Sequence, residues 1–553
     1  MMETIRDCDV LVIGSGAIGA TYARCLAGMG RQVVMIDTGP QIRSRPGEHL
    51  LNTFRYQHEP NLSLDEGLAN HNTYSTAQNY LPQMLPPGAY RPDLKRLNFE
   101  NPNQDPKLNM PFAASMYAVG GMFSFWSGFA PIPTKADRTD LIPEDDWGPM
   151  IDMSIKLLNV HTDAFEPSIV NSCVREVLST PERTVRNMPM GAQKRSVDAQ
   201  VPGSGTYYVD WTGSDTILGP LLGDDNRTVS NLQILESHRA EEILHDGAHV
   251  TGVRVRNLRN LSTIEFRAAQ FVVATNALPG ASLLWASGVR PPALGRYLCD
   301  NPVATGNIHV GDAFVERLRG HPDNPSTGEA VPIPWTDPPP KTGLAPTADC
   351  PWLVHVSRTG RVMTYHTASD VRLSMDITGY TTVEARKENF VEFSDTMQDR
   401  FGMPQMTFHY SLTDADNARC QAMLQDVNEL GKTIGVWGKM SRPPFESGAT
   451  LQVPGTSLHI TGVTRMGTDD TDSVVDSNSR VWGFDNLYVG GQGVLRESMA
   501  INPTFTCCAI AIKSAASMLG ISVQELESKV APTPETADPG MPLDWRRPDS
   551  GYA

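Results

Sequence analysis

The order of hydrophobic and polar residues is most regular near the start of the chain. Residues 8–14 (CDVLVIG) form a short apolar run that ends in glycine, which predicts a buried strand. Residues 17–30 then space small and apolar side chains at helical intervals, and residues 32–37 (QVVMID) form a second apolar run. We therefore expect a strand–helix–strand unit of a parallel sheet at this end of the chain.

The same kinds of pattern return farther along the chain in separated pieces. Strand-like runs fall between residues 228 and 275 (NLQIL, HVTGVRV, TIEFRA and QFVVAT), and residues 455–520 resume the patterning of the first unit. Between them, residues 296–450 are crowded with prolines and carry runs such as WLVHV and RLSMDI. We expect an α/β fold in which a Rossmann-like dinucleotide-binding domain is intertwined with an α+β substrate-binding domain.

At 553 residues the chain exceeds the ~250–300 residues at which a single core usually stops growing, so two connected domains are expected. The expected segments are a first part of the cofactor domain (1–48), an extended arm or surface excursion (49–105), a cofactor-lining segment (106–134), a first part of the substrate domain (135–205), a second part of the cofactor domain (206–295), a second part of the substrate domain (296–454), a C-terminal catalytic and cofactor-binding segment (455–525) and a proline-rich surface tail (526–553).

Charge and composition exclude several classes of partner. The formal net charge of −16 argues against a nucleic-acid or anionic-membrane surface, because both need basic patches. Residues 108–134 carry no charge, but prolines, glycines and serines interrupt them, so we expect buried chain rather than a membrane span. The eight cysteines form no CxxC pair and no metal-site spacing, and the first residues lead directly into a strand. We expect reduced thiols, no metal and a cytoplasmic protein.

A glycine-rich turn follows the first predicted strand and opens the predicted helix. Its pattern is Gly14-Ser15-Gly16-Ala-Ile-Gly19, the context in which a GxGxxG motif indicates dinucleotide binding. Gly14 suits the tight turn, Gly16 lets main-chain amides approach a pyrophosphate, and Gly19 lets the helix close on the strand. Asp37 ends the second strand, where it is placed to accept hydrogen bonds from ribose hydroxyls.

The glycine motif does not separate NAD from FAD. The late run Val272–Thr275 and the later strand Leu487–Gly490 favour FAD, since flavin folds return to the sheet in this way. An apolar helix that opens at Asn502 would direct its positive end at a flavin. A plain core helix explains the same residues, and both interpretations can hold together.

His459 and Asn502 are candidates for chemistry on either side of the glycine turn 490–493. An imidazole titrates near neutral pH and takes a proton, and a carboxamide orients an oxygen and stabilises charge that develops on it. From the residues alone, a satisfied core histidine and a helix cap remain the simpler interpretation.

Several blocks of the sequence resemble one family. The chain resembles the glucose-methanol-choline flavin oxidoreductases, and among them the pyranose oxidase branch. The resemblance is carried by Ile13–Gly16, Thr21–Arg24, Asn101-Pro102, Gln104–Pro106, Val119–Met122, Val331–Pro334, Arg465–Gly467, Asp476–Arg480, Asp485–Leu487, Gly490–Gly493 and Asn502–Thr504. It implies the FAD-binding architecture of that family, which is shared with p-hydroxybenzoate-hydroxylase-like flavoproteins.

The resemblance also implies roles for individual residues. His459 matches the base that removes the proton of the sugar hydroxyl, and Asn502 matches the asparagine that holds the same oxygen. The implied contacts to FAD are made by Gly14, Ser15, Gly16, Gly19, Asp37, Gly120, Gly121, Met122, Ser124, Trp126, Ser127, Gly491, Asn502 and Thr504.

The sequence departs from the fungal pattern at three places. Phe125 stands where the fungal enzymes carry the histidine that links the flavin, so we expect FAD to be bound non-covalently. Thr464 stands where they show a second histidine. The loop after Trp352 also differs, and we expect His355, Arg358 and Phe125 to contact substrate.

The expected reaction is oxidation of a secondary hydroxyl of a pyranose or glycoside to a ketone, with C3 favoured as in bacterial relatives that bind FAD without a covalent link. O₂ or a quinone would accept the electrons. The resemblance also allows a homo-oligomer. Three alternatives stay open: a pyranose 2-oxidase acting on free glucose, a redox-neutral lyase on the same fold, and a protein that binds FAD without catalysis.

Overall fold

The computed structural model describes residues 4–52, 71–73, 101, 103–104, 109–111, 113–194, 209–223, 225, 227–334, 336–358, 370–399, 402–437 and 448–530. The predicted strand–helix–strand unit is present at its start: β1 spans Thr4–Ile13, α1 spans Ala17–Gly28 and β2 spans Val33–Ile36. All four residues of β2 are buried, and the side chains of α1 are buried almost all round. A helix of this kind lies inside the protein, between a sheet and further helices.

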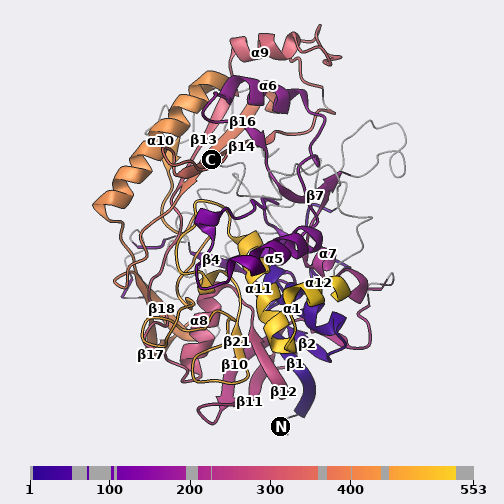
Figure 1. Ribbon diagram of the computed structural model, residues 1–553, viewed down its shortest axis with the longest axis vertical. Coiled ribbons are helices and arrows are strands. Elements are labelled where there is room, and N and C mark those ends of the chain that lie inside the picture. The colour runs from indigo at the N-terminus through magenta and orange to yellow at the C-terminus, as the bar shows by residue number, and fades with distance from the viewer. Residues whose placement is uncertain are drawn as a thin grey trace.

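The first large sheet gathers strands from three separate parts of the sequence. Its order is β10-β11-β12-β1-β2-β9, and β21 pairs with β12. The pairs among β1, β2, β9, β12 and β21 are parallel, whereas β10 and β11 form an antiparallel edge. The later strands are β9 (Leu232–Leu235), β10 (His238–His245), β11 (Val250–Asn257), β12 (Thr263–Val273) and β21 (Leu487–Val489). This sheet occupies the lower half of the molecule in Figure 1.

The second large sheet is antiparallel and lies in the upper half of Figure 1. Its order is β19-β13-β16-β15-β14-β6, with β20 paired to β13. The strands are β6 (Arg186–Asn187), β13 (Val303–Val310), β14 (Lys341–Leu344), β15 (Trp352–Ser357), β16 (Ser374–Thr381), β19 (Gly435–Trp437) and β20 (Thr450–Leu451).

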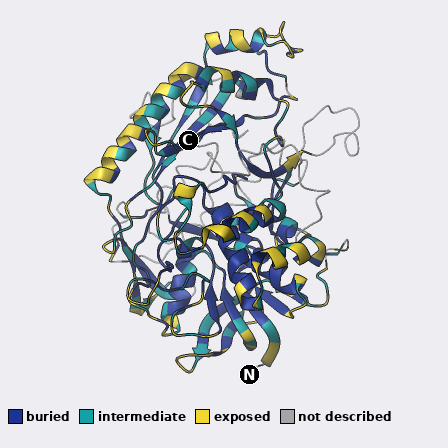
Figure 2. Ribbon diagram, in the orientation of Figure 1, coloured by how far each residue is buried: buried dark blue, intermediate teal, exposed yellow. Residues whose placement is uncertain are grey.

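Helices cover both sheets. The long helix α10 (Asp414–Ile434) lies along β13 and β16 and turns an exposed face outward (Figure 2). On the first sheet, α1 packs against β1 and β2, and α11 (Thr504–Leu519) packs against α1 and α5 (Glu144–Leu157). The remaining longer helices are α6 (Ile169–Leu178), α7 (Ser214–Leu218), α8 (Ala277–Ala286) and α9 (Asp312–Arg319).

Smaller pieces complete the described chain. The hairpin of β17 (Phe390–Gln398) and β18 (Pro404–His409) forms one two-stranded sheet, and β3 (His71–Thr73) pairs with β4 (Ala114–Met116) in another. A three-stranded sheet has the order β5 (Val160–His161), β7 (Met190–Lys194) and β8 (Val209–Trp211). Single turns of 3-10 helix lie at Gly121–Ser124, Lys135–Asp137, Gly219–Leu221, Val371–Leu373 and Gln492–Val494.

The proline-rich tail begins later than the sequence predicted. Helix α12 spans Val523–Val530, so residues 526–530 are helical rather than trailing chain. Leu526 and Val530 are buried, and Val530 lies against Gly28 of α1. The apolar spacing of this short helix was hidden by the prolines that follow it. Residues 531–553, and most of the expected arm 49–105, lie outside the described residues.

Within the part of the chain that the structure describes, no single helix is long and apolar enough to cross a membrane. The bent pair α11 and α12 meets the length and composition criteria only when the two helices are taken together across a 99° bend.

Candidate active site

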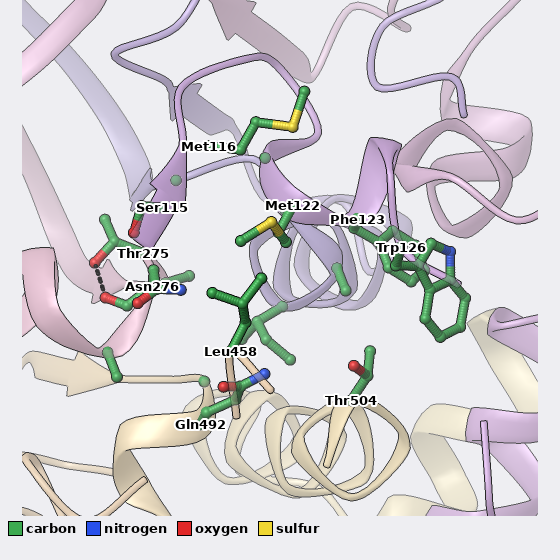
Figure 3. A pocket seen from close by; sticks show the side chains of 18 of the residues that line it. Ser115, Met116, Met122, Phe123, Trp126, Thr275, Asn276, Leu458, Gln492 and Thr504 are labelled. Carbon is green, nitrogen blue, oxygen red and sulfur yellow. Dashed lines mark hydrogen bonds between the residues drawn. The ribbon is translucent and has the colours of Figure 1, made fainter. Parts of the chain in front are cut away.

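A cavity opens at the carboxyl ends of the parallel strands β1, β2 and β12, where open α/β sheets bind their ligands. Three distant parts of the sequence form its walls (Figure 3). Met122, Phe123 and Trp126 come from the segment after β4, Thr275 and Asn276 follow β12, and Gln492 and Thr504 come from the C-terminal part. Met122 and Leu458 project toward one another across the middle.

The glycine turn after β1 can approach a ligand closely. Gly14 has a φ of 105°, and a Cβ there would lie 2.6 Å from the carbonyl oxygen of Ala274. A Cβ on Gly19 would lie 1.9 Å from the carbonyl oxygen of Gly14, so Gly19 lets the helix close on the turn and does not itself line the cavity. Gly16 caps α1 without a side-chain hydrogen bond, which leaves first-turn amides of α1 available to a phosphate.

Asp37 directly follows β2 and lines the cavity. Its Oδ2 accepts hydrogen bonds from the hydroxyl (2.5 Å) and the amide (3.0 Å) of Ser15, and its Oδ1 accepts one from the amide of Gly39 (2.8 Å). Burial raises the pKa of this carboxyl to about 6, although these hydrogen bonds oppose the shift. Asp37 is therefore held in place by Ser15 and stands where a ribose would lie.

The segment after β4 forms the opposite wall. Gly121, Met122, Phe125, Trp126 and Ser127 all line the cavity. Two other predicted contacts support this wall from behind: the amide of Gly120 donates to the Ser15 hydroxyl (2.9 Å), and the Ser124 hydroxyl donates to the carbonyl of Gly121 (2.8 Å).

The two candidate catalytic residues meet at one end of the cavity. Nδ2 of Asn502 lies 3.3 Å from Nε2 of His459, and both residues line the cavity. Asn502 stands two positions before α11, which begins at Thr504, so it does not open the helix as the sequence suggested. Burial lowers the pKa of His459 to about 3, so the imidazole is neutral at ordinary pH. A neutral imidazole beside an amide donor is suited to taking a proton from an alcohol.

Three residues that line the cavity each carry a buried polar atom with no hydrogen-bond partner among the described residues. They are Oγ of Ser115, Oε1 of Gln492 and Oδ1 of Asn502. A buried polar atom without a partner costs about 1–3 kcal/mol, so a polar ligand is expected to satisfy these groups. Together with the glycine cradle and Asp37, they fit a dinucleotide cofactor.

The residues that hold His459 in place were not predicted from the sequence. Its Nδ1 lies 2.9 Å from Oδ1 of Asn301, and its main-chain amide donates to Oδ1 of Asp300 (3.0 Å). The ring of Tyr380 in β16 lies 5.6 Å from the imidazole and lines the cavity. The only signal in the sequence was the polar pair Asp300-Asn301 just before Pro302, at the start of the second expected domain.

The two substrate candidates after Trp352 lie behind the cavity wall. His355 stacks between Phe129 (4.3 Å) and Tyr380 (5.7 Å), both of which line the cavity. Both ring nitrogens of His355 lack a partner among the described residues, and burial lowers its pKa to about 3. Arg358 donates instead to the main-chain carbonyls of Arg372 and Asp337 (both 3.2 Å) and does not line the cavity.

The described residues contain no group of three or more His, Cys, Asp or Glu side chains that could hold a metal ion. All eight cysteines are free. Cys507 lines the cavity from the first turn of α11, and burial raises the pKa of its thiol well above the usual value.

Comparison with known proteins gives the family. A family model described as GMC oxidoreductase matches residues 385–511, and one described as FAD binding domain matches residues 174–332. The chain is 32% identical to a pyranose 2-oxidase from Tricholoma matsutake, over 94% of this chain and 95% of that protein. It is 31% identical to a C-glycoside 3-oxidase from Microbacterium trichothecenolyticum, over 92% of this chain and 95% of that protein.

Solved structures show the same fold. A crystal structure of formate oxidase matches with a TM-score of 0.62 and 13% identity, over 94% of this chain and 99% of that one. Pyridoxine 4-oxidase from Mesorbium loti matches with a TM-score of 0.60 and 17% identity, over 93% and 99%. The resemblance read from the sequence motifs is confirmed, and the chain belongs to the FAD-dependent GMC oxidoreductases.

Proposed function

We propose that this protein oxidises a secondary hydroxyl of a pyranose or glycoside to a ketone, with C3 as the favoured position. The observation that carries the proposal is the pair of His459 and Asn502 at one end of the FAD cavity, 3.3 Å apart, with Asn502 buried and His459 half-buried. The relatives named pyranose 2-oxidase and C-glycoside 3-oxidase support a sugar substrate, and they support oxidation over the redox-neutral lyase alternative.

The cavity residues would hold FAD along its length. Gly14 and Gly16 at the start of α1 would bind the pyrophosphate, Asp37 the ribose, and the wall from Gly121 to Ser127 would line the ring system. Gly491, Asn502 and Thr504 would close the site from the other side. Bound FAD supplies a two-electron acceptor for the hydride that leaves the sugar carbon.

His459 would take the proton of the reacting hydroxyl at Nε2. The alcohol becomes a better proton donor as negative charge grows on its oxygen, so a neutral imidazole suffices as the base. Without sugar, Nδ2 of Asn502 lies 3.3 Å from Nε2; with sugar bound it would donate to the sugar oxygen instead, which frees the Nε2 lone pair for the proton. One hydroxyl would thus be held by two groups while the carbon beside it loses hydride, and a ketone is left.

Aromatic side chains on the substrate side would receive the sugar ring. Tyr380 and Phe129 both line the cavity, Tyr380 lies 5.6 Å from the ring of His459, and His355 packs against both aromatic rings. We propose that the unpartnered nitrogens of His355 contribute to substrate binding after a small movement of these rings. For Arg358 we propose an indirect part, since its guanidinium is bonded to two main-chain carbonyls.

We propose that FAD is bound without a covalent link, because Phe125 lines the cavity with a phenyl ring that has no nucleophile. The electron acceptor would be O₂ or a quinone. The free cysteines are consistent with a cytoplasmic location. Acid precipitation of the purified protein should release the yellow colour into the supernatant, and colour that stays in the pellet would contradict the non-covalent proposal.

The decisive experiment follows flavin absorbance near ~450 nm, a band set by the oxidised cofactor, under anaerobic conditions. The protein is mixed separately with glucose and with a phenolic C- or O-glycoside, and the product is identified by NMR. Bleaching by the glycoside with a ketone at C3 is expected. A ketone at C2 of glucose would make the protein a pyranose 2-oxidase, and no bleaching by any sugar would overturn the proposal.

A further inference from the structure

The main chain beside His459 runs antiparallel to residues 299–301. Cys299 and Thr461 form an isolated bridge and exchange both hydrogen bonds, with N–O distances of 3.1 and 2.9 Å. Asn301 lies two residues after Cys299 and His459 lies two residues before Thr461, so in this antiparallel pair the two residues stand opposite each other. The two residues are 158 positions apart in the sequence, and the bridge sets their distance.

The side chain of Asn301 has a defined orientation. Its Nδ2 donates to the carbonyl of Met499 (3.1 Å), so its oxygen is the atom that faces the imidazole. That oxygen, Oδ1, lies 2.9 Å from Nδ1 of His459. An amide oxygen accepts hydrogen bonds and cannot donate them, so Nδ1 must carry the hydrogen. A neutral imidazole has one N–H, which leaves the lone pair on Nε2.

We propose that Asn301 is a positioning residue that locks His459 in the tautomer with hydrogen on Nδ1, so that Nε2 is always the proton acceptor. This inference rests on the proposed role of His459 as the base. It also explains the orientation of Asn502: an unprotonated Nε2 calls for a donor, and Nδ2 of Asn502 is 3.3 Å away.

The neighbouring residue Asp300 holds the main chain that carries the ring. Its carboxylate accepts hydrogen bonds from the hydroxyl of Ser457 (2.5 Å) and the amides of Gly455 (2.8 Å) and His459 (3.0 Å). Within this turn Leu458 has a φ of 60°, in the left-handed region that bulky residues rarely adopt. Asp300 therefore fixes the turn, while Asn301 fixes the ring.

A second buried asparagine provides a comparison, because its contacts are purely structural. Asn324 is also buried, and its amide makes hydrogen bonds only to the main chain: to the carbonyls of Leu318 (2.7 Å) and Pro332 (2.9 Å) and from the amide of Ser326 (2.8 Å). The oxygen of Asn301 instead faces the ring of the proposed base. Asn324 is the matched control.

The first test measures the tautomer directly. In the FAD-loaded protein labelled with ¹⁵N-histidine, the His459 resonances are identified by their loss in His459→Gln. We expect a protonated Nδ1 and an unprotonated Nε2 in the absence of sugar. A protonated Nε2 would overturn the inference, whatever the protein does with sugars.

The second test compares variants. Asn301→Ala removes the acceptor, so we expect both tautomers in the spectrum and anaerobic flavin reduction about 10- to 100-fold slower, the scale of a misplaced catalytic group. Asn301→Asp keeps an oxygen acceptor, so it should keep the tautomer and recover much of the rate at high pH. Its negative charge should move the acid limb of the rate profile to higher pH.

Asn324→Ala should leave the tautomer and the reduction rate unchanged, and flavin absorbance with thermal unfolding confirms that each variant is folded and loaded. An Asn301→Ala protein that keeps one tautomer and the wild-type rate would overturn the inference. If the wild type is bleached by no sugar, the proposed function fails, and the tautomer spectra still decide the role of Asn301.

Discussion

Burial gives His459 an uncommon combination of properties. Its pKa of about 3 means that the ring does not compete for protons with water at ordinary pH, so the base form is always present. The same burial makes the imidazolium unfavourable, so proton transfer is expected to accompany hydride departure and not to precede it. The imidazolium is therefore expected to form only while the sugar reacts, and its free energy of burial is a cost only in that reacting complex.

Substitution of His459 should slow the reaction with sugar and leave FAD binding unchanged. His459→Ala removes the proton acceptor, and we expect sugar-dependent flavin reduction to fall about 10²- to 10⁴-fold, the usual contribution of a general base. Stopped-flow absorbance under anaerobic conditions measures this rate, and FAD content should stay near that of the wild type.

His409→Ala is the matched control for that substitution. Its ring lies on the hairpin strand β18, its side chain is 42% exposed, and it contacts Glu392 at 3.0 Å. Its reduction rate should equal that of the wild type. A His459→Ala protein that loses no more rate than this control would remove His459 from the mechanism.

The sequence did not distinguish glycines that line the cavity from glycines that only allow close packing. Gly14, Gly19 and Gly120 belong to the same predicted cofactor-binding set, but only Gly14 lines the cavity. A Cβ on Gly19 or Gly120 would meet main chain within 2.9 Å, so these glycines serve close packing. A glycine needed by a ligand and one needed by a neighbouring turn look alike in a sequence, because both mark close approach.

At the scale of elements, the turn 455–459 is tied to the residues that precede β13 by one carboxylate. Burial raises the pKa of Asp300 to about 6. Above that pH the carboxylate accepts its three hydrogen bonds, and below it a proton takes the place of one acceptor site. Because the turn carries His459, we expect anaerobic flavin reduction to slow as pH falls through about 6.

The other ionisable groups near this carboxyl do not titrate in that range. Burial raises the pKa of Tyr380 and of Cys299 to about 12 and that of Tyr410 well above its usual value, and His459 is neutral above about 3. Asp300→Asn should therefore lose the transition near pH 6. Asp37 also lines the cavity and has a pKa of about 6, so a transition that persists in this variant would assign it to Asp37.

The titration of Asp300 should affect the free energy of unfolding in the opposite direction to its effect on the reduction rate. A folded pKa of about 6 lies above the ordinary aspartate value of 3.8, so the folded state binds the proton more tightly. This contribution to the free energy of unfolding is present below about pH 4 and is lost as pH rises toward 6. Denaturant unfolding across this range would distinguish it from the effect on rate.

Elements were predicted well where the pattern of apolar residues is complete within one short segment. α1 and β2 lie within two residues of their expected bounds, whereas β1 ends within one residue of its expected end but begins four residues earlier. Each of these patterns is complete within a few residues. α12 was missed because only three buried residues mark its face toward α1, α5 and α11, and prolines follow directly after it; the three are Val523, Leu526 and Val530. The contact of Asn301 with His459 was also missed, since it depends on a main-chain bridge between distant segments.

At the scale of the whole molecule, the cofactor cavity is where separated segments meet. Its lining comes from residues 13–38, 115–129, 274–279, 457–459 and 491–507, together with His238 and Tyr380. FAD would therefore contact chain that spans nearly the entire fold. A ligand with such contacts stabilises the protein as a unit.

Removal of FAD should lower the midpoint of thermal unfolding. Saturation at 1,000 times the dissociation constant stabilises a fold by about 4 kcal/mol, so we expect a decrease of several degrees in the apoprotein. Differential scanning calorimetry of the holoprotein, the apoprotein and the apoprotein with FAD added back measures it. Identical midpoints in all three samples would contradict the assignment of this cavity to FAD.

The bridge between Cys299 and Thr461 has a consequence for recombination within the family. Residues 299–301 lie just before β13 of the second sheet, yet Asp300 and Asn301 hold the turn and ring of His459. A chimaera that exchanges this sheet between relatives would separate the two partners if its crossover point fell before Cys299. A crossover after Pro302 would exchange the second sheet while the parent keeps His459 together with Asp300 and Asn301, the residues that orient it.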